Sequence, residues 1–549
     1  MFNNKQSYLT DQVITYLGNK RKLLKFIDDS VEDIIKNDLE LSKKKKSDIS
    51  FFDIFSGSGI VARYANKKGY TVYANDLEIY SSVINITMLN ITPKEAQKKC
   101  LHAIKTINKT LKENIPEDGD SYQNLISYLN NLVHPRNNDS LYFSIHYAPK
   151  DTNNPDFHNE RLFYTQENAL WLDAIVEIIH DNTLVNNVVK NLILTSVMYL
   201  MTKHINTSGT MKGFHNGWGG TNKNALERIM CKMQITKLPL LEHNKYNRTY
   251  NHRAENVFQN EIIPEIDIVY ADPPYNQHQY SANYNHLTTI CLNDKYDPGK
   301  VIQGSRAGIR KEHNRSDFCK SQKNKDTNKK EAEVAFINFI TSIECKYIVM
   351  SYNNEGVVDI EELLNILSQD GKNHISVKEQ DYQKYRGGKN TVQCGKVIEY
   401  LLIIQMNRQQ NFEELTELKT RLTSNKLTIQ LKDAFINYNE LEEPYIVSEQ
   451  ENGHILISKN DKKLLDIDKK TYRVLFEYDG IDIKDDILFL LSKKLDKTQR
   501  MELHIKDQNI ELALQLLNGF NIKKLKSIRE DFIKRIDEIQ NNHSMDLLI

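Results

Sequence analysis

The chain has 549 residues, which is too long for one hydrophobic core, so two or three folded units are expected. Lys plus Arg and Asp plus Glu both number 73, and this balance excludes a protein that binds nucleic acid through a strongly basic overall composition. Six cysteines without a Cys-x-x-Cys pair, and no apolar stretch long enough to span a bilayer, predict reduced thiols, no metal site and a cytoplasmic protein without a membrane partner.

The first predicted element is a Gly-Asn turn followed by three cations. Tyr16, Gly18, Asn19 and Lys20 belong to the run Tyr-Leu-Gly-Asn-Lys-Arg-Lys, and an apolar-periodic helix follows it. Cations are more favourable at the C-terminus of a helix than at its N-terminus. The cluster therefore favours an anionic partner, with a solvated helix start as the alternative.

A strand, a glycine turn, a helix and a second strand come next. The strand that contains Asp53 leads into a turn with Gly57 and Gly59, a helix is expected over Val61–Lys68, and the second strand ends at Asp76. This order is typical of the nucleotide-binding half of a doubly wound α/β sheet, where an acid after the second strand accepts hydrogen bonds from ribose hydroxyls. A cofactor that contains a ribose is predicted.

The turn alone does not identify that cofactor, because Gly57-x-Gly59-x-x-Ala62 also satisfies the dinucleotide fingerprint. Asp53 argues against a dinucleotide, since a carboxylate beside the turn would repel a pyrophosphate and attract a cationic ligand. S-adenosyl-L-methionine, which carries an ammonium and a sulfonium, fits this charge.

A largely helical region is expected at residues 92–261. Helical patterns cover Leu162–His180 and Val188–Lys203, and a segment rich in glycine and aromatic residues follows them. That segment contains Lys212, His215 and Trp218, and its glycines permit close approach to a ligand. A loop that contacts a ligand is the interpretation, with plain packing as the alternative for His215 and Trp218.

Asp272-Pro273-Pro274-Tyr275 directly follows a buried-strand pattern at Ile266–Ala271. The lone pair of the exocyclic amine of adenine is delocalised, and acceptors aimed at its two N–H bonds would localise it for attack on a methyl donor. The Asp272 carboxylate and the Pro273 carbonyl can be those acceptors, both prolines fix the backbone, and Tyr275 offers a stacking face. An ordinary turn after a strand is the alternative interpretation.

The segment at residues 306–330 is rich in Lys and Arg and poor in apolar residues. A mobile basic loop that contacts phosphates through Arg306, Arg310, Lys311 and Arg315 is the hypothesis, and a merely solvated loop is the alternative.

Residues 408–549 are expected to form a C-terminal α+β extension, to which the sequence assigns no role. Its helical patterns lie at Leu415–Leu422 and Ile522–Ile539, and its strand-like runs lie at Pro444–Val447 and His454–Ile457.

Four motifs in this order resemble those of the Dam-like, alpha-group adenine-N6 DNA methyltransferases of restriction-modification type. They are Tyr16–Lys20, Asp53–Gly59, Asn75-Asp76 and Asp272–Tyr275, and the resemblance continues to about Met406. It implies a Rossmann-like, S-adenosylmethionine-dependent methyltransferase sheet. Residues 1–91 would hold the cofactor motifs, 92–261 a target-recognition insert and 262–407 the catalytic part. Within the insert, the segment that contains Lys212, His215 and Trp218 would contact DNA.

The resemblance also implies roles for individual residues. Tyr16 and Lys20 would hold the carboxylate and sulfonium end of the donor, and Asp76 its ribose. Asn256 falls where such enzymes often place an acid near the cofactor adenine. The segment that would cradle the donor comprises Asp53, Phe55, Ser56, Gly57, Ser58 and Gly59.

The preferred interpretation is a site-specific enzyme that methylates N6 of an adenine flipped out of double-stranded DNA, with a cognate restriction endonuclease as an expected partner. An RNA adenine-N6 methyltransferase and a non-catalytic, cofactor-binding specificity subunit are the two alternatives.

Overall fold

The computed structural model describes residues 7–11, 13–221, 223–242, 246–300, 306–310, 315–324, 327–353, 356–382, 397–419, 421–422, 445–450, 454–459 and 462–468. The chain forms two compact units. The first comprises Met1–Tyr352, Asn373–Lys378 and Tyr400–Arg408, and the second comprises Asn353–Lys372, Glu379–Glu399 and Gln409–Ile549.

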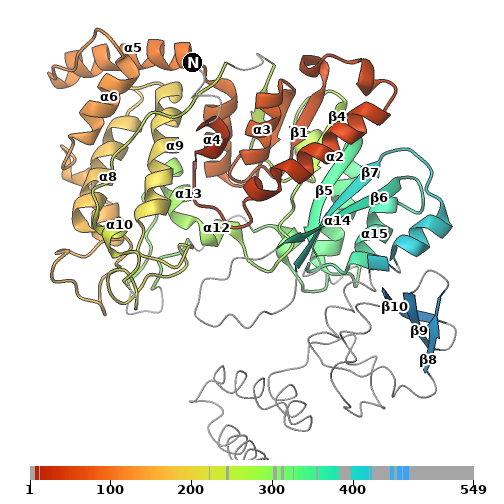
Figure 1. Ribbon diagram of the computed structural model, residues 1–549. Coiled ribbons are helices and arrows are strands. Elements are labelled where there is room, and N and C mark those ends of the chain that lie inside the picture. Colours follow the sequence, from red (N-terminus) through yellow and green to blue (C-terminus); the bar gives the residue numbers. More distant parts are fainter. Residues whose placement is uncertain are drawn as a thin grey trace, which may run out of the picture. The chain divides into compact units, whose positions relative to one another are not determined.

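A seven-stranded sheet organises the fold, in the order β3-β2-β1-β4-β5-β7-β6 (Figure 1). The strands are β1 (Ser50–Asp53), β2 (Thr71–Asn75), β3 (Arg248–Tyr250), β4 (Ile266–Ala271), β5 (Cys345–Asn353), β6 (His374–Tyr382) and β7 (Val397–Gln405). The pairs from β3 through to β5 are parallel, and every residue of β4 is buried, as expected for a strand that is covered on both faces. The predicted α/β sheet is confirmed.

The chain order of the strands reverses between β1 and β4, because β2 and β3 extend the sheet on one side and β5 on the other. In open α/β sheets, ligands bind beyond the carboxyl ends of the strands at such a switch point. Asp53 ends β1 and Asp272 follows β4, so the fold brings these two distant carboxylates to the same place.

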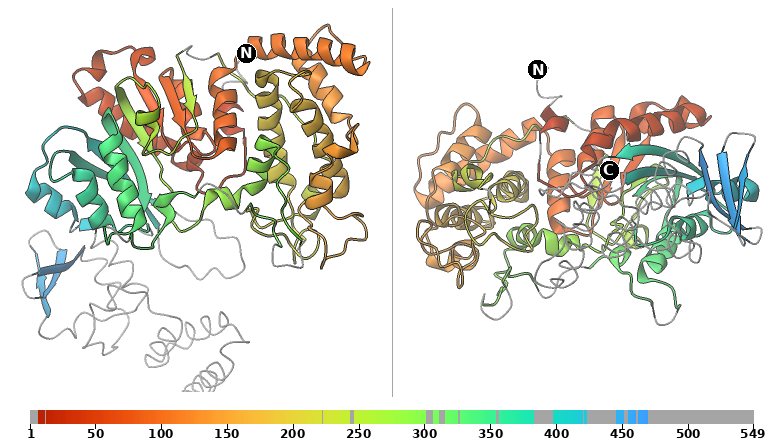
Figure 2. Two further views of the ribbon diagram at one scale, coloured as in Figure 1. Left: turned by 180° about the vertical axis from the view of Figure 1, so that it is seen from behind. Right: turned by 60° about the horizontal axis from the view of Figure 1, so that its bottom comes forward.

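Helices cover both faces of the sheet, with α2 (Leu24–Asn37) and α14 (Glu331–Ser342) on opposite sides (Figures 1 and 2). The predicted helix over Val61–Lys68 is α3 (Ile60–Lys68); it lies between Gly59 and Gly69, which both adopt positive φ and so mark its ends. The remaining helices of this part are α4 (Ile79–Asn90), α11 (Val257–Asn260), α12 (Tyr280–Asn283) and α13 (Asn285–Leu292), with short 3-10 turns at Lys20–Leu23, Leu41–Lys43, Lys46–Asp48 and Asp317–Cys319.

The region between β2 and β3 is largely helical, as predicted. It contains α5 (Pro93–Leu111), α6 (Ser121–Asn130), α7 (Phe143–His146), α8 (Gln166–Ile179), α9 (Asn187–His204) and α10 (Leu226–Met230), with a 3-10 turn at Asn138–Ser140. Side-chain caps explain where its two predicted helices begin: Thr165 caps α8 and Asn186 caps α9. The buried core of this region continues into α4 and α13, so it is packed onto the sheet's own helices.

Strand β3 lies within the range that the sequence assigns to the insert, yet it pairs with β2 in the sheet. The sheet therefore takes one strand from residues 92–261. Asn247 explains why this short strand is held: its buried side chain accepts from the Val72 amide and donates to Leu89.

The described part of the second unit contains α15 (Ile360–Ser368) and an antiparallel sheet of β8 (Tyr445–Glu449), β9 (His454–Lys459) and β10 (Lys462–Asp468). The predicted strand runs overlap β8 and β9, with Pro444 outside the described residues. Helix at residues 412–419 and 421–422 overlaps the predicted Leu415–Leu422. The predicted helix over Ile522–Ile539 lies outside the described residues. Among the described helices, none has the length and apolarity needed to cross a membrane.

Candidate active site

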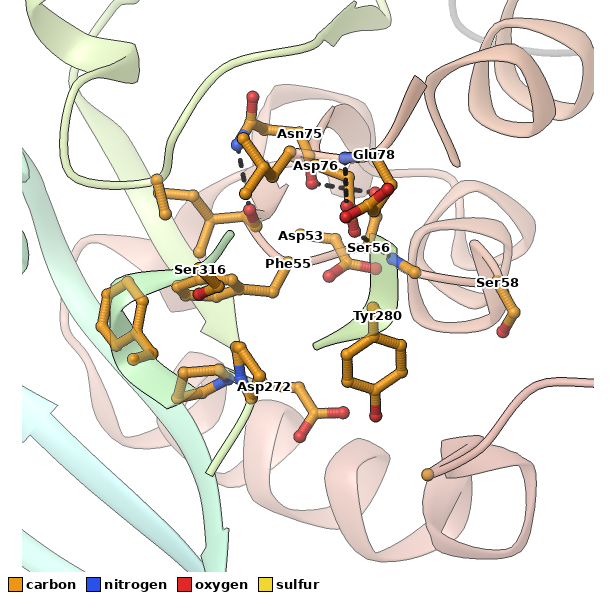
Figure 3. Close-up of a pocket in the computed structure, with 18 of the residues that line it drawn as sticks. Asp53, Phe55, Ser56, Ser58, Asn75, Asp76, Glu78, Asp272, Tyr280 and Ser316 are labelled. Atoms are coloured by element: carbon orange, nitrogen blue, oxygen red, sulfur yellow. Dashed lines mark hydrogen bonds between the residues drawn. The ribbon is translucent and has the colours of Figure 1, made fainter. Parts of the chain in front are cut away.

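A cavity lies at the carboxyl ends of β1, β2 and β4 (Figure 3). All four of the predicted motifs contribute to its wall, the third through both Asn75 and Asp76. Of the predicted cofactor and catalytic residues, those that line it are Tyr16, Gly18, Asn19, Lys20, Asp53, Phe55, Ser56, Gly57, Ser58, Asp76, Asp272, Pro273, Pro274 and Tyr275. Gly59 does not line it; it forms the start of α3 with φ +70°.

The glycine turn after β1 is shaped by contacts that only glycine allows. Gly57 has φ +49°, and a Cβ there would lie 2.7 Å from Cε1 of Tyr16. The amide of Gly57 donates to Oδ2 of Asp76 at 2.7 Å. The turn is thus fixed from one side by an aromatic ring and from the other by a carboxylate.

Asp53 is a buried acid with spare hydrogen-bonding capacity. Its Oδ2 accepts from the Ala62 amide at 3.0 Å, whereas its Oδ1 is buried without a hydrogen-bond partner among the described residues. Burial raises the pKa of Asp53 well above its usual value, and the nearby Asp272 and Asp76 raise it further. A cation in the cavity would favour the ionised form of this carboxylate.

Asp76 is engaged by the backbone rather than left open for a ligand. Its Oδ2 accepts from Gly57 and its Oδ1 accepts from the Glu78 amide at 2.8 Å. Glu78 also lines the cavity, is buried, and receives no hydrogen bond at its carboxylate within the described chain. Burial raises the pKa of Glu78 well above its usual value, with Asp76 as the second cause. Glu78, which the sequence analysis did not single out, is therefore a second acid of this cavity, and its carboxylate is not engaged by the described chain.

The catalytic motif forms an ion pair with the first motif. Lys20 Nζ lies 3.2 Å from Oδ1 of Asp272 and 5.6 Å from the centroid of the Tyr275 ring. The Lys20 side chain is only 5% exposed. The resemblance assigns Lys20 to the donor carboxylate, but here its ammonium is joined to the predicted catalytic acid. Tyr275 in turn contacts Tyr352 edge to face, at 5.9 Å between ring centroids.

The predicted cofactor-binding residue Asn256 is next in sequence to a residue that lines the cavity. Asn256 does not line the cavity, whereas its neighbour Glu255 does, and Glu255 is paired with Arg253 at 3.5 Å. Arg253 also binds Asp317 at 3.1 Å and the carbonyl of Arg315. An acid is therefore present near the position that the resemblance implies.

The cavity contains more acidic than basic side chains. Its ionisable acids are Asp53, Asp76, Glu78, Glu255 and Asp272, and its cations are Lys20 and Arg253. S-adenosylmethionine fits this environment, because it is a net cation with an ammonium, a sulfonium and one carboxylate. The partnerless oxygen of Asp53 and the glycine turn support the same conclusion.

The two segments predicted to contact DNA lie against each other. Arg306 donates to the Asn216 side chain, and its guanidinium lies 4.6 Å from the centroid of the Phe214 ring. Lys212 and Arg306 are exposed, as is Arg315. Lys212 lies near Cys319, whose neighbour Phe318 lines the cavity.

Arg310, His215 and Trp218 have structural partners. Arg310 forms a bidentate ion pair with Asp294, and the Arg310 side chain is only 11% exposed. Trp218 donates to the Thr152 carbonyl at 3.0 Å and packs on the hydrophobic core, while the ring of His215 lies against Gly220. Lys311 lies outside the described residues.

Comparison with known proteins identifies relatives of this chain. The family model for D12 class N6 adenine-specific DNA methyltransferase matches residues 16–380. Modification methylase StsI of Streptococcus sanguinis is 28% identical over 397 residues, 71% of this chain and 51% of that protein. Type II methyltransferase M.FokI of Planomicrobium okeanokoites is 26% identical over 397 residues, 71% of this chain and 52% of that protein.

A shorter relative is matched almost completely. Type II methyltransferase M.NlaIII of Neisseria lactamica is 24% identical over 400 residues, which are 71% of this chain and 99% of that protein. The chain spans only about half the length of StsI and M.FokI. No solved structure matches the chain. With the family model covering most of the chain, including every cavity motif, the protein belongs to the D12 class of N6 adenine-specific DNA methyltransferases.

Proposed function

We propose that the protein is a site-specific DNA methyltransferase that transfers a methyl group from S-adenosylmethionine to N6 of adenine. The observation that carries this proposal is the position of Asp272 and Tyr275 in the same cavity as Asp53 and the glycine turn. The adenine that accepts the methyl group and the cationic methyl donor can therefore both bind at the switch point of the sheet.

Each group in the cavity has a distinct task. Asp53 and Glu78 would hold the ammonium and the ribose of the donor, which supplies an electrophilic methyl group. Asp272 would accept a hydrogen bond from the adenine amine and so increase the electron density on N6. It would also take the proton that N6 releases once the carbon–nitrogen bond has formed.

The adenine must leave the duplex to reach Asp272, and unstacking it costs a few kcal/mol. Stacking on Tyr275, worth roughly 1 to 3 kcal/mol per base, would offset much of this cost. The edge-to-face contact with Tyr352 fixes the ring of Tyr275 and supports this role.

Double-stranded DNA is the proposed substrate, and residues 92–261 the proposed target-recognition region. The exposed cations Lys212, Arg306 and Arg315 would contact its phosphates. Since the named relatives are modification methylases and type II methyltransferases, a cognate restriction endonuclease that reads the same site is the proposed partner. The order of the motifs, with the donor motifs before the catalytic motif, supports membership of the alpha group.

The test is transfer of a labelled methyl group to unmethylated plasmid DNA, followed by mapping of the modified adenines. We expect discrete N6-methyladenine sites with the unsubstituted protein and none with Asp272→Ala. Asp272→Ala should still bind DNA, because it loses only the amine acceptor. Transfer to RNA alone, or donor binding without transfer to any nucleic acid, would overturn the proposal and favour one of the two alternatives.

A further inference from the structure

Tyr280 is a cavity residue that lies outside the four motifs. It begins α12, five residues after Tyr275, and in Figure 3 its side chain and those of Asp53 and Asp272 point into the same cavity. Its ring stacks on Tyr16, with 5.1 Å between ring centroids and 28° between planes. Its hydroxyl donates to the Leu17 carbonyl at 3.3 Å.

Tyr284, one helical turn later, contacts the same segment. Its hydroxyl accepts from the Leu17 amide at 2.7 Å, and its ring stacks on Tyr16 at 4.9 Å. Leu17 is thus hydrogen-bonded through its amide to Tyr284 and through its carbonyl to Tyr280, and both tyrosines follow the catalytic motif. The ring of Tyr16 lies between these tyrosines and Gly57 of the donor turn.

The conformation of the first motif fits these contacts. Gly18 has φ +74°, and a Cβ there would lie 3.3 Å from the Tyr280 hydroxyl. The glycine therefore lets the turn approach Tyr280 closely, two residues before Lys20.

The catalytic segment is consequently joined to the first motif at both its ends. Asp272 is attached through Lys20, and Tyr280 is attached through Leu17 and Tyr16. The segment between them carries Pro273, Pro274 and Tyr275. Contacts with residues 16–20, which also line the donor side of the cavity, help to hold it beside the donor turn, and Gln279 bonds to Ser316 on its other side.

We propose that Tyr280 is a positioning residue that fixes residues 272–279 relative to the donor site, so that the amine acceptor and the methyl donor meet at reacting distance. This inference rests on the proposed function. Misplacement of reacting groups by about 1 Å can cost roughly 100-fold in rate, so loss of the contact should act on turnover more than on binding.

The test compares Tyr280→Leu, which loses the ring and the hydroxyl, with Tyr280→Phe, which keeps the stack on Tyr16. We expect Tyr280→Leu to lower kcat by roughly 10- to 100-fold while the donor Kd and the KM for DNA change only a few-fold. Tyr280→Phe should recover most of kcat. Tyr8→Phe is the matched control, because the buried Tyr8 hydroxyl also donates to a carbonyl, that of Met88, but Tyr8 is not a cavity residue.

Amide hydrogen exchange gives a second readout that needs no nucleic acid. Tyr280→Leu should speed exchange selectively in residues 272–279, and Tyr8→Phe should not. Unchanged kcat and exchange in Tyr280→Leu would overturn the positioning role, and so would a loss shared equally by kcat, donor affinity and thermal stability. If the unsubstituted protein methylates no DNA, the proposed function fails, and the exchange experiment still decides whether Tyr280 holds the segment.

Discussion

At the scale of single residues, the Lys20–Asp272 ion pair suggests that Lys20 acts on the catalytic carboxylate, whereas the resemblance assigns it to the carboxylate of the donor. Lys20→Gln would leave Asp272 among other acids without its cation, which disfavours the ionised form that accepts from an amine. We expect kcat to fall by roughly 10- to 100-fold with the donor Kd almost unchanged. Steady-state kinetics and donor titration measure both quantities. A large rise in donor Kd with normal kcat would restore the role that the resemblance assigns to Lys20.

Asp76 and Glu78 should respond differently to loss of charge. Glu78→Gln removes a carboxylate with no hydrogen bond from the described chain, so donor affinity should fall roughly 10-fold while thermal stability is kept or raised. Asp76→Asn replaces one of the two carboxylate oxygens that accept hydrogen bonds from the Gly57 and Glu78 amides, so it should lower the melting temperature. Calorimetric titration and thermal melts of both variants test this. Equal melting temperatures together with a larger affinity loss in Asp76→Asn would return the ribose role to Asp76.

The raised pKa values of Asp53 and Glu78 predict a pH-dependent donor affinity. The folded protein holds protons that the unfolded chain releases, so the stability of the unliganded protein should fall as pH rises from about 4 through the raised values. A cationic donor favours the ionised acids, so donor affinity should rise over the same window. Binding titrations with the donor between about pH 5 and 7.5, where the amino group of the donor stays largely protonated, measure this rise in affinity. Asp53→Asn should flatten the rise, and a flat profile in the unsubstituted protein would contradict the argument.

Single residues also mark the limit of what the sequence could predict. The residues of the last three motifs were found because each motif combines a residue type with a strand end, and the first motif because a Gly-Asn turn with three cations precedes a helix. Glu78 and Tyr280 follow their motifs by a few residues, and nothing in their spacing reveals that they turn into the cavity. The partner of Lys20 was equally hidden, because Asp272 is far from it in sequence and only the tertiary fold brings the 3-10 turn at Lys20–Leu23 to the end of β4.

At the scale of elements, hydrophobic periodicity and end signals predicted the long ones well. Helices α8 and α9 and strand β4 lie within a few residues of their expected bounds, since each has a clear apolar pattern. Strand β3 was not expected. Arg248-Thr249-Tyr250 is too short to carry a period, and it is held by pairing with β2 and by Asn247 rather than by its own pattern.

The turn between β1 and α3 offers a test of element geometry. In Gly57→Ala the new methyl group would meet the Tyr16 ring, and the left-handed backbone would add about 1 to 2 kcal/mol of strain. We expect lower stability by at least about 1 kcal/mol and weak donor binding. Gly213→Ala is the matched control, because a Cβ there meets nothing within 4 Å. Equal melting curves and equal donor affinities for the two variants would show that the turn tolerates a side chain.

At the scale of the whole molecule, the balanced net charge hides an uneven distribution. The cavity is acidic, as a cationic donor requires, whereas exposed cations lie on the two segments that contact each other through Arg306 and Asn216. A polyanion would be repelled by the first region and attracted by the second. The separation lets one chain bind ligands of opposite charge without a basic overall composition.

This distribution predicts which cations set the salt dependence of DNA binding. Each phosphate contact contributes about 0.9 to the slope of log K against log salt, so Lys212→Gln, Arg306→Gln and Arg315→Gln should each lower its magnitude by about one. Arg310→Gln should not, because Asp294 already neutralises that guanidinium. Lys105→Gln is the second control: Lys105 is exposed on α5, which Figure 1 places at the far end of the helical region from α12. Binding measured by fluorescence anisotropy across a salt series separates the cases. Equal slopes for Arg306→Gln and Lys105→Gln would mean that DNA approaches the cavity over a different surface.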